Sequence, residues 1–174
     1  MLNAFKKFGF GPDLTNWVAV LMSDTKSCIS YCGWISDSFS VESGIRQGCP
    51  FSSLAFILSI ELLAIKIRHS SNIKGVRHQN RDTTQLIKIA LYADDITLFL
   101  TDEKDLQNAT EIINQFSEIS GLILNSSKSE AMWLGSNKQR LDIPCGFALK
   151  SQLKILGVYF SAIKQASMIE DNWL

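Results

Sequence analysis

Two adjacent carboxylates, Asp94 and Asp95, stand between two apolar runs in the stretch from Leu86 to Leu100. Two like charges so close together make each other costly to ionise, and a protein keeps such a pair where a cation neutralises it or where water screens it. The pair therefore predicts a divalent metal site. A solvated turn that happens to contain two acids is the alternative.

The residues on either side of this pair predict two strands joined by a tight turn. Ile, Leu, Tyr and Phe favour strands, and Asp tolerates turn geometry because its side chain hydrogen-bonds to the nearby backbone. Both faces of the strands are largely apolar, with Ile87, Ile89, Leu91, Ile96, Leu98 and Leu100 on one face and Leu86, Ala90 and Phe99 on the other. A strand pair that is buried on both faces lies in the middle of a sheet. We therefore expect a central hairpin with the two carboxylates at its tip.

Two further segments could contact phosphate. Residues 44 to 56 form a glycine-containing loop that leads into a helix with Pro50 in its first turn. Glycine allows close backbone approach and a helix N-terminus offers free amides, so a phosphate or nucleotide could lie there. A plain loop is the commoner explanation of such residues. Residues 68 to 81 contain six basic side chains and no acid. They form either a contact to a phosphate backbone or a solvated loop.

The composition is that of one folded domain with its own core. The chain has 174 residues, of which 46% are hydrophobic, and 17 basic side chains balance 17 acidic ones. With no net charge, any binding of nucleic acid has to be local. The four cysteines, at positions 28, 32, 49 and 145, lack zinc-ligand spacing, so we expect buried, reduced thiols.

No segment has the pattern of a signal peptide or a membrane span. The N-terminus lacks a long apolar core and a cleavage site, and the longest apolar run, residues 51 to 67, contains three serines, Glu61 and Lys66. We expect this run to be a buried helix. An intracellular protein of the nucleus or cytoplasm, with no membrane partner, is the corresponding expectation.

The remaining patterns predict an α+β fold. Helices are expected over residues 1 to 8, from Pro12 onward, and from a cap at Thr101 or Asp102 to a stop at Gly121. Short strands are expected at residues 28–32, 39–41, 122–124 and 131–134, and a last hairpin over residues 147–160. This order of elements is that of a split sheet with helices on one face.

Four short motifs occur in an order and at a spacing that resemble the palm of reverse transcriptases, especially those of non-LTR retrotransposons of the LINE kind. They are RQGCPFSS at 46–53, YADD at 92–95, GLILNSSKS at 121–129 and LGV at 156–158. The resemblance implies a partial, ferredoxin-like palm over residues 1–160 with a remnant of the fingers. Within it, residues 1–43 connect palm and fingers, 44–134 form the palm core and 147–160 a primer-grip hairpin. Residues 161–174 begin the connection to a thumb that this sequence lacks.

The family resemblance implies an RNA-directed DNA polymerase, which joins deoxynucleoside triphosphates to the 3′ end of a DNA primer on an RNA template. Its chemistry uses two Mg²⁺ ions held by carboxylates. By position, Asp94 matches a metal ligand of the family, and Asp95 matches the second family aspartate, whose contact with metal is less constant. Tyr92 would lie beside the primer end. The resemblance implies no oligomeric state.

The other motifs imply nucleotide and primer contacts. Gln47 and Gly48 would line the nucleotide pocket with Arg46 beside them, and Leu156 and Gly157 would grip the primer strand. Lys128 matches a lysine that could donate a proton to the leaving pyrophosphate, although a solvent-exposed turn lysine is an equal alternative.

The sequence also departs from the family pattern. A further metal-binding aspartate, in a motif of the Ala-Phe-Asp kind, should precede Leu2, and none of Asp13, Asp24 or Asp37 fits that motif. Phe51 and Ser53 stand where Leu and Pro are usual, and no endonuclease domain or cysteine-rich element is present. We therefore expect an incomplete two-ion site and no polymerase activity of this chain alone.

Two other functions stay open at the level of sequence. One is an inert remnant of a decayed retroelement, which motif content cannot separate from a fragment of an active polymerase. The other is an RNA-binding α/β module, which would carry stacking aromatics on its central strands. The aliphatic hairpin with an acidic tip argues against such a module.

Overall fold

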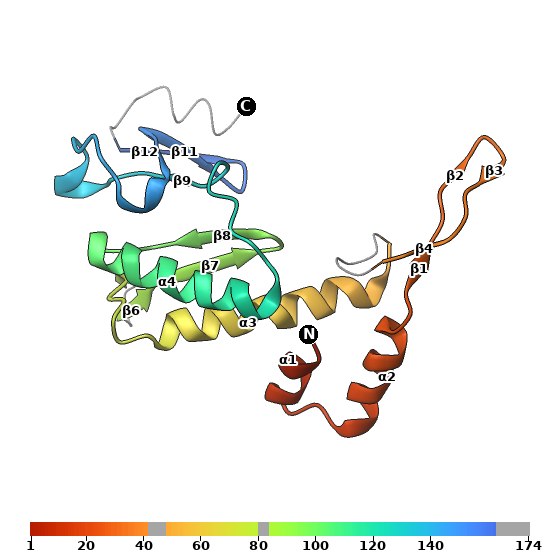
Figure 1. Cartoon of the computed structure of the whole chain (residues 1–174). Helices are drawn as coiled ribbons and strands as arrows, with labels where there is room; N and C mark the ends of the chain where they lie inside the picture. The colour runs from red at the N-terminus through yellow and green to blue at the C-terminus, as the bar shows by residue number, and fades with distance from the viewer. Residues whose placement is uncertain (42–47, 80–83, 163–174) are drawn as a thin grey trace. The chain divides into compact units, whose positions relative to one another are not determined.

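The computed structural model describes residues 1–41, 48–79 and 84–162, and the chain forms two compact units that divide between Leu62 and Leu63 (Figure 1). The long helix α3 (Pro50–His69) begins in the first unit and ends in the second. In the described part of the chain, none of the helices is both long and apolar enough to cross a membrane.

The first unit contains α1 (Leu2–Lys7), α2 (Pro12–Met22) and the start of α3, as the sequence predicts. Proline suits the first position of α2 because amides in a first helical turn have no partner within the helix. Phe5, Val18 and Ala55 are buried together, and Phe51 packs against them. The ring of Phe5 lies 5.9 Å from the ring of Phe51, which joins α1 to α3.

A two-part ribbon extends from the first unit. Its inner part pairs β1 (Lys26–Ser27) with β4 (Phe39–Ser40), and its outer part pairs β2 (Ser30–Tyr31) with β3 (Trp34–Ile35) (Figure 1). None of the four cysteines is in a disulfide, which agrees with reduced thiols, but the prediction that they are buried is wrong. Cys28 and Cys32 lie exposed on this ribbon, and Cys145 is exposed elsewhere.

The second unit contains two hairpins that follow one another directly in the chain. The strand β5 (Val76–Gln79) pairs with β6 (Thr84–Ile87), and β7 (Ile89–Tyr92) pairs with β8 (Asp95–Leu98). The chain changes partners at Lys88, whose carbonyl accepts a hydrogen bond of 2.8 Å from the amide of Phe99. The predicted tight hairpin is confirmed, although it starts at Ile89 because the preceding residues pair with β5.

The expectation that the β7–β8 hairpin is buried on both faces is wrong. Ile89 is buried, but Ala90, Tyr92 and Ile96 are exposed. In the described part of the chain no third strand pairs with β7 or β8, so the hairpin has no further strand at either edge there.

The helix α4 (Glu103–Ser120) follows this hairpin, and its ends are where the sequence predicts them. The Asp102 side chain accepts a hydrogen bond from the Asp105 amide, and Gly121 ends the helix with a φ of 73°. Leu106, Ala109 and Ile113 form its buried face.

The last part of the chain contains short strands and two 3₁₀ turns. The strand β9 (Glu130–Ala131) runs parallel to β10 (Ala148–Leu149), and β11 (Gln152–Ile155) pairs with β12 (Val158–Ser161). The turns are η1 (Gly135–Asn137) and η2 (Pro144–Gly146). Residues 122–124 do not form the predicted strand. The class is α+β as predicted, and because the described strands form separate two-stranded ladders, the split palm sheet stays a prediction.

A buried carboxylate anchors the root of the β7–β8 hairpin, the end at which Lys88 and Leu100 lie. The side chain of Asp105 is 1% exposed and accepts hydrogen bonds from the Thr101 hydroxyl at 2.7 Å, the Thr101 amide at 3.1 Å and the Lys74 amide at 3.1 Å. Burial alone would raise the pKa of Asp105, but these hydrogen bonds outweigh it and hold the pKa below its ordinary value of 3.8.

The turn between β11 and β12 consists of Leu156 and Gly157, with φ values of 50° and 87°. Two positive φ angles are typical of a two-residue hairpin turn, for which Asn-Gly is the favoured sequence. Glycine adopts this conformation freely, but for leucine it costs about 1–2 kcal/mol. The Leu156 side chain is 57% exposed, so burial does not offset this cost.

Replacing Asp105 by Asn should lower the free energy of unfolding by about 2–3 kcal/mol, because an amide cannot accept all the hydrogen bonds of the carboxylate. Since the pKa of Asp105 is depressed, the stabilisation is present above the ordinary value of 3.8 and is lost as pH falls through the folded-state pKa. Urea unfolding should therefore give a difference between wild type and Asp105→Asn that shrinks below that pH. Glu118→Gln, at an exposed position on the same helix, is the control and should change stability little.

Replacing Leu156 by Asn should stabilise the β11–β12 hairpin by about 1 kcal/mol, because Asn tolerates a positive φ. Hydrogen exchange of the strand amides measures this local gain, which corresponds to roughly fivefold greater protection. The exposed Leu141 has no positive φ, and Leu141→Asn should leave that protection unchanged. Equal or lower protection in Leu156→Asn would contradict the assignment of backbone strain to this turn.

Candidate functional site

The β7–β8 turn presents the two carboxylates at its tip. Tyr92 pairs directly with Asp95, so the turn consists of Ala93 and Asp94 alone. All four of these residues are exposed. Neither carboxylate forms a hydrogen bond or an ion pair with any residue in the described part of the chain, so their oxygens are available to a ligand.

The backbone at this tip is held in a conformation that its residue type disfavours. Ala93 has a φ of 52°, which costs an L-residue about 1–2 kcal/mol and which glycine would adopt freely. Backbone strain of this kind is concentrated at functional sites, where the surrounding structure holds it in place. Asp94 follows this strained residue and directly precedes β8.

The donor set at the tip fits a divalent ion of the Mg²⁺ type. Such ions prefer oxygen ligands, and protein sites for Mg²⁺ often use one or two carboxylates together with water and substrate phosphates. Among the described residues no group of three or more His, Cys, Asp or Glu side chains could hold a metal by itself. An ion at this tip would therefore need further ligands, from water or substrate, besides Asp94 and Asp95.

The predicted nucleotide-binding loop is described only in part. Arg46 and Gln47 lie outside the described residues, whereas Gly48 has a φ of 81°, a conformation that favours glycine. The helix α3 begins two residues later, as predicted from Pro50. Gly48 belongs to the first unit and Asp94 to the second, and each is placed only within its own unit.

Lys128 lies in a turn that Asn125 organises. The carbonyl and side-chain oxygens of Asn125 accept hydrogen bonds from the Lys128 amide at 3.1 and 3.2 Å, and Ser127 donates to the same side chain at 2.7 Å. The Lys128 side chain is exposed. Within the described part no hydrogen bond or ion pair joins it to Asp94 or Asp95. The other predicted pair, Leu156 and Gly157, forms the tip of the β11–β12 hairpin.

The basic segment 68–81 is described as far as residue 79, and residues 70–75 form a loop between α3 and β5. Arg68 and His69 end α3, and Arg77 lies on β5. The ammonium group of Lys74 forms an ion pair of 2.7 Å with Asp102. Their hydrogen bond lowers the pKa of Asp102 and raises that of Lys74.

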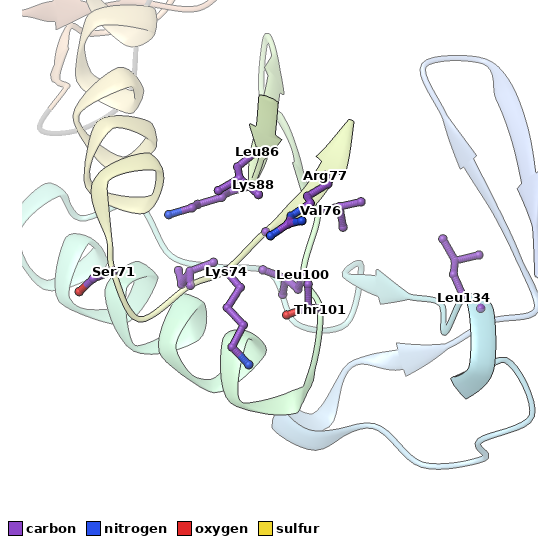
Figure 2. Close-up of a pocket in the computed structure, with 12 residues that line it drawn as sticks. Ser71, Lys74, Val76, Arg77, Leu86, Lys88, Leu100, Thr101 and Leu134 are labelled. Carbon is purple, nitrogen blue, oxygen red and sulfur yellow. The ribbon is translucent and has the colours of Figure 1, made fainter. Parts of the chain in front are cut away.

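A cavity of about 820 Å³ lies in the second unit, at the root of the β7–β8 hairpin. The connection from α3 to β5, the strands β5 and β6, the connection from β8 to α4 and the residues after β9 line it (Figure 2). Its lining includes Lys74, Arg77 and Lys88. None of the predicted site residues that the structure describes contributes to it, and sequence reasoning missed both this cavity and the Asp105 anchor. Only the basic character of residues 68–81 gave a signal for the cavity.

Comparison with known proteins gives a match over residues 2–160 to the family described as reverse transcriptase (RNA-dependent DNA polymerase). A transposon TX1 uncharacterized 149 kDa protein of Xenopus laevis is 27% identical over 166 residues, which are 93% of this chain and 12% of that protein. The retrovirus-related Pol polyprotein from type-2 retrotransposable element R2DM of Drosophila melanogaster is 30% identical over 112 residues, which are 64% of this chain and 10% of that protein. The chain thus spans about an eighth or less of the length of these relatives.

Reverse transcriptases act on nucleic-acid templates and primers with nucleotides, and they generally use divalent metal ions. The match covers almost all of the sequence, and both relatives are proteins of transposable elements. The resemblance carried by the four motifs is therefore confirmed, and the chain belongs to the reverse transcriptase family, as a domain of the kind found in non-LTR retrotransposons.

Proposed function

We propose that this chain supplies part of the palm of an RNA-directed DNA polymerase that extends a DNA primer on an RNA template of a non-LTR retrotransposon. The partial palm comprises residues 1–160, with residues 1–43 leading to the fingers, 44–134 as its core and 147–160 as the primer-grip hairpin. The observation that carries the proposal is the exposed Asp94–Asp95 pair on a strained two-residue turn, in a chain of this family.

Asp94 and Asp95 are the proposed ligands of Mg²⁺. When bound, divalent ions at this point favour the ionised primer hydroxyl and neutralise charge on the triphosphate. Tyr92 lies directly opposite Asp95, and side chains of directly opposed strand residues share a face. Tyr92 therefore stands beside the primer end that the carboxylates face.

The other motifs supply the contacts to the incoming nucleotide, the pyrophosphate and the primer. Arg46, Gln47 and Gly48 bind the incoming nucleotide, and the left-handed backbone of Gly48 favours close approach of a phosphate. Lys128 donates a proton to the leaving pyrophosphate. Leu156 offers an exposed apolar side chain at a turn tip, where contact with the primer sugar positions the 3′ end.

In a polypeptide that carries this sequence together with more of its parent protein, Asp94→Asn should reduce primer extension at least about 100-fold, the scale of losing one electrostatic contact to a transition state. Extension of a labelled primer on an RNA template with Mg²⁺ measures the effect. Asp37→Asn, at an exposed position of the outer ribbon, is the control and should retain activity. Unchanged extension in Asp94→Asn would exclude the proposed role.

The 174-residue chain alone should give no extension product, because a site with one acidic strand should not hold both ions. The same assay on the purified chain tests this. A product that disappears in Asp94→Asn would show that the chain contains a complete site.

Replacing Lys128 by Met should lower kcat about 100-fold in the longer polypeptide while KM changes little, since a general acid acts in the transition state. Lys138→Met, at another exposed position, is the matched control. Equal loss in both variants, or a change confined to KM, would argue for an ordinary turn lysine at position 128.

A further inference from the structure

We propose that the cavity at the root of the β7–β8 hairpin binds an acidic, aliphatic peptide segment of a partner protein. Its volume of about 820 Å³ lies within the range of roughly 300–1,000 Å³ that is typical of ligand pockets. The inference does not rest on the proposed polymerase activity.

The cavity offers an apolar surface for a peptide side chain. Ile73 is fully buried in its wall, whereas Leu86 and Leu134 line it and remain 57% and 61% exposed. Figure 2 shows Leu134 apart from the other labelled side chains. Exposed apolar side chains that line one cavity indicate a binding surface, because a ligand that covers them removes apolar area from water.

The charged side chains that line this apolar surface are cationic. Lys74 is paired with Asp102, and the Lys88 side chain donates a hydrogen bond of 2.7 Å to the Ser70 carbonyl. The guanidinium of Arg77 has no partner in the described part of the chain. No Asp or Glu is among the described lining residues, but Asp102 pairs with Lys74 and Asp105 bonds to Thr101 from just outside the lining. Arg77 is therefore the cation that is open to an incoming carboxylate. A guanidinium can bind a carboxylate through two parallel hydrogen bonds.

The same lining argues against a nucleic acid as the ligand. Single-stranded nucleic acids stack their bases on aromatic side chains, and no aromatic residue is among the described residues of the cavity. The strand β5, which carries Arg77, pairs with β6 alone in the described part, so its second edge can also accept an extended peptide.

The cavity is separate from the candidate active site. Leu100 lines the cavity, whereas Asp95 begins β8 at the other end of the hairpin. Five residues of extended chain span roughly 15 Å. A peptide can therefore occupy the cavity without covering the carboxylates.

Fluorescence anisotropy with the full 174-residue chain tests the proposal. The probe is a short labelled peptide of alternating Leu and Glu, and its twin of alternating Leu and Lys is the ligand control. The Leu-Glu peptide should bind, and Arg77→Glu and Leu134→Asp should each weaken binding about tenfold or more. Lys104→Glu changes an exposed lysine of α4 outside the cavity and should leave binding unchanged. Thermal unfolding of each variant verifies that it folds.

Three results would overturn the proposal. The first is no binding of the Leu-Glu peptide up to ~1 mM, a concentration at which even a weak specific site is occupied. The second is equal binding of the Leu-Lys twin. The third is displacement of the peptide by single-stranded oligodeoxythymidine whose own binding is lost in Arg77→Glu, which would make the cavity a nucleic-acid site.

Discussion

The buried carboxylate of Asp105 holds together the part of the chain on which the candidate active site depends. A two-stranded hairpin is marginally stable by itself, and β7–β8 has no further strand beside it in the described part of the chain. Asp105 binds Thr101, just after the hairpin, and Lys74, just before β5, and it lies in the first turn of α4. A buried carboxylate without these hydrogen bonds would be strongly unfavourable, so the connections on both sides of the hairpin are fixed together.

The turns of the β7–β8 and β11–β12 hairpins both contain a residue with a strained backbone. Ala93 and Leu156 both adopt positive φ at turn tips where Gly or Asn would cost less. One follows the tyrosine and precedes the carboxylates of the proposed metal site, and the other belongs to the proposed primer grip. In both turns the residue type costs stability, because a side chain disfavours the left-handed backbone. The anchored root and the strained tip together give the carboxylates a defined position.

Local features of this structure could be predicted from the sequence, whereas features that depend on long-range packing could not. The cap at Asp102, the stop at Gly121 and the turn before Asp95 follow from hydrogen bonds and dihedral preferences within a few residues. The choice of strand partners depends on tertiary packing. The sequence therefore places Leu86 in the hairpin of Asp94, whereas it lies on β6 and pairs with β5.

Burial is also a property of the tertiary structure, which is why the cysteines were expected inside. An acid in a first helical turn, such as Asp105, looks locally like a favourable partner for the helix dipole. Only the fold brings it to the amide of Lys74, 31 residues earlier. The candidate metal ligands could be named from sequence because their spacing is local. The cavity at the other end of the hairpin could not be predicted, since four separate segments of the chain form it.

The central claim, that the β7–β8 tip binds a divalent metal ion, is tested most directly by iron-mediated cleavage of the chain. Fe²⁺ substitutes for Mg²⁺ at oxygen-ligand sites and, with ascorbate and peroxide, cuts the backbone near the place where it binds. If Asp94 and Asp95 bind the ion, cleavage should occur between residues 92 and 96, excess Mg²⁺ should suppress it and Asp94→Asn should abolish it. Cleavage only elsewhere, or cleavage at the tip that persists in Asp94→Asn, would contradict this claim.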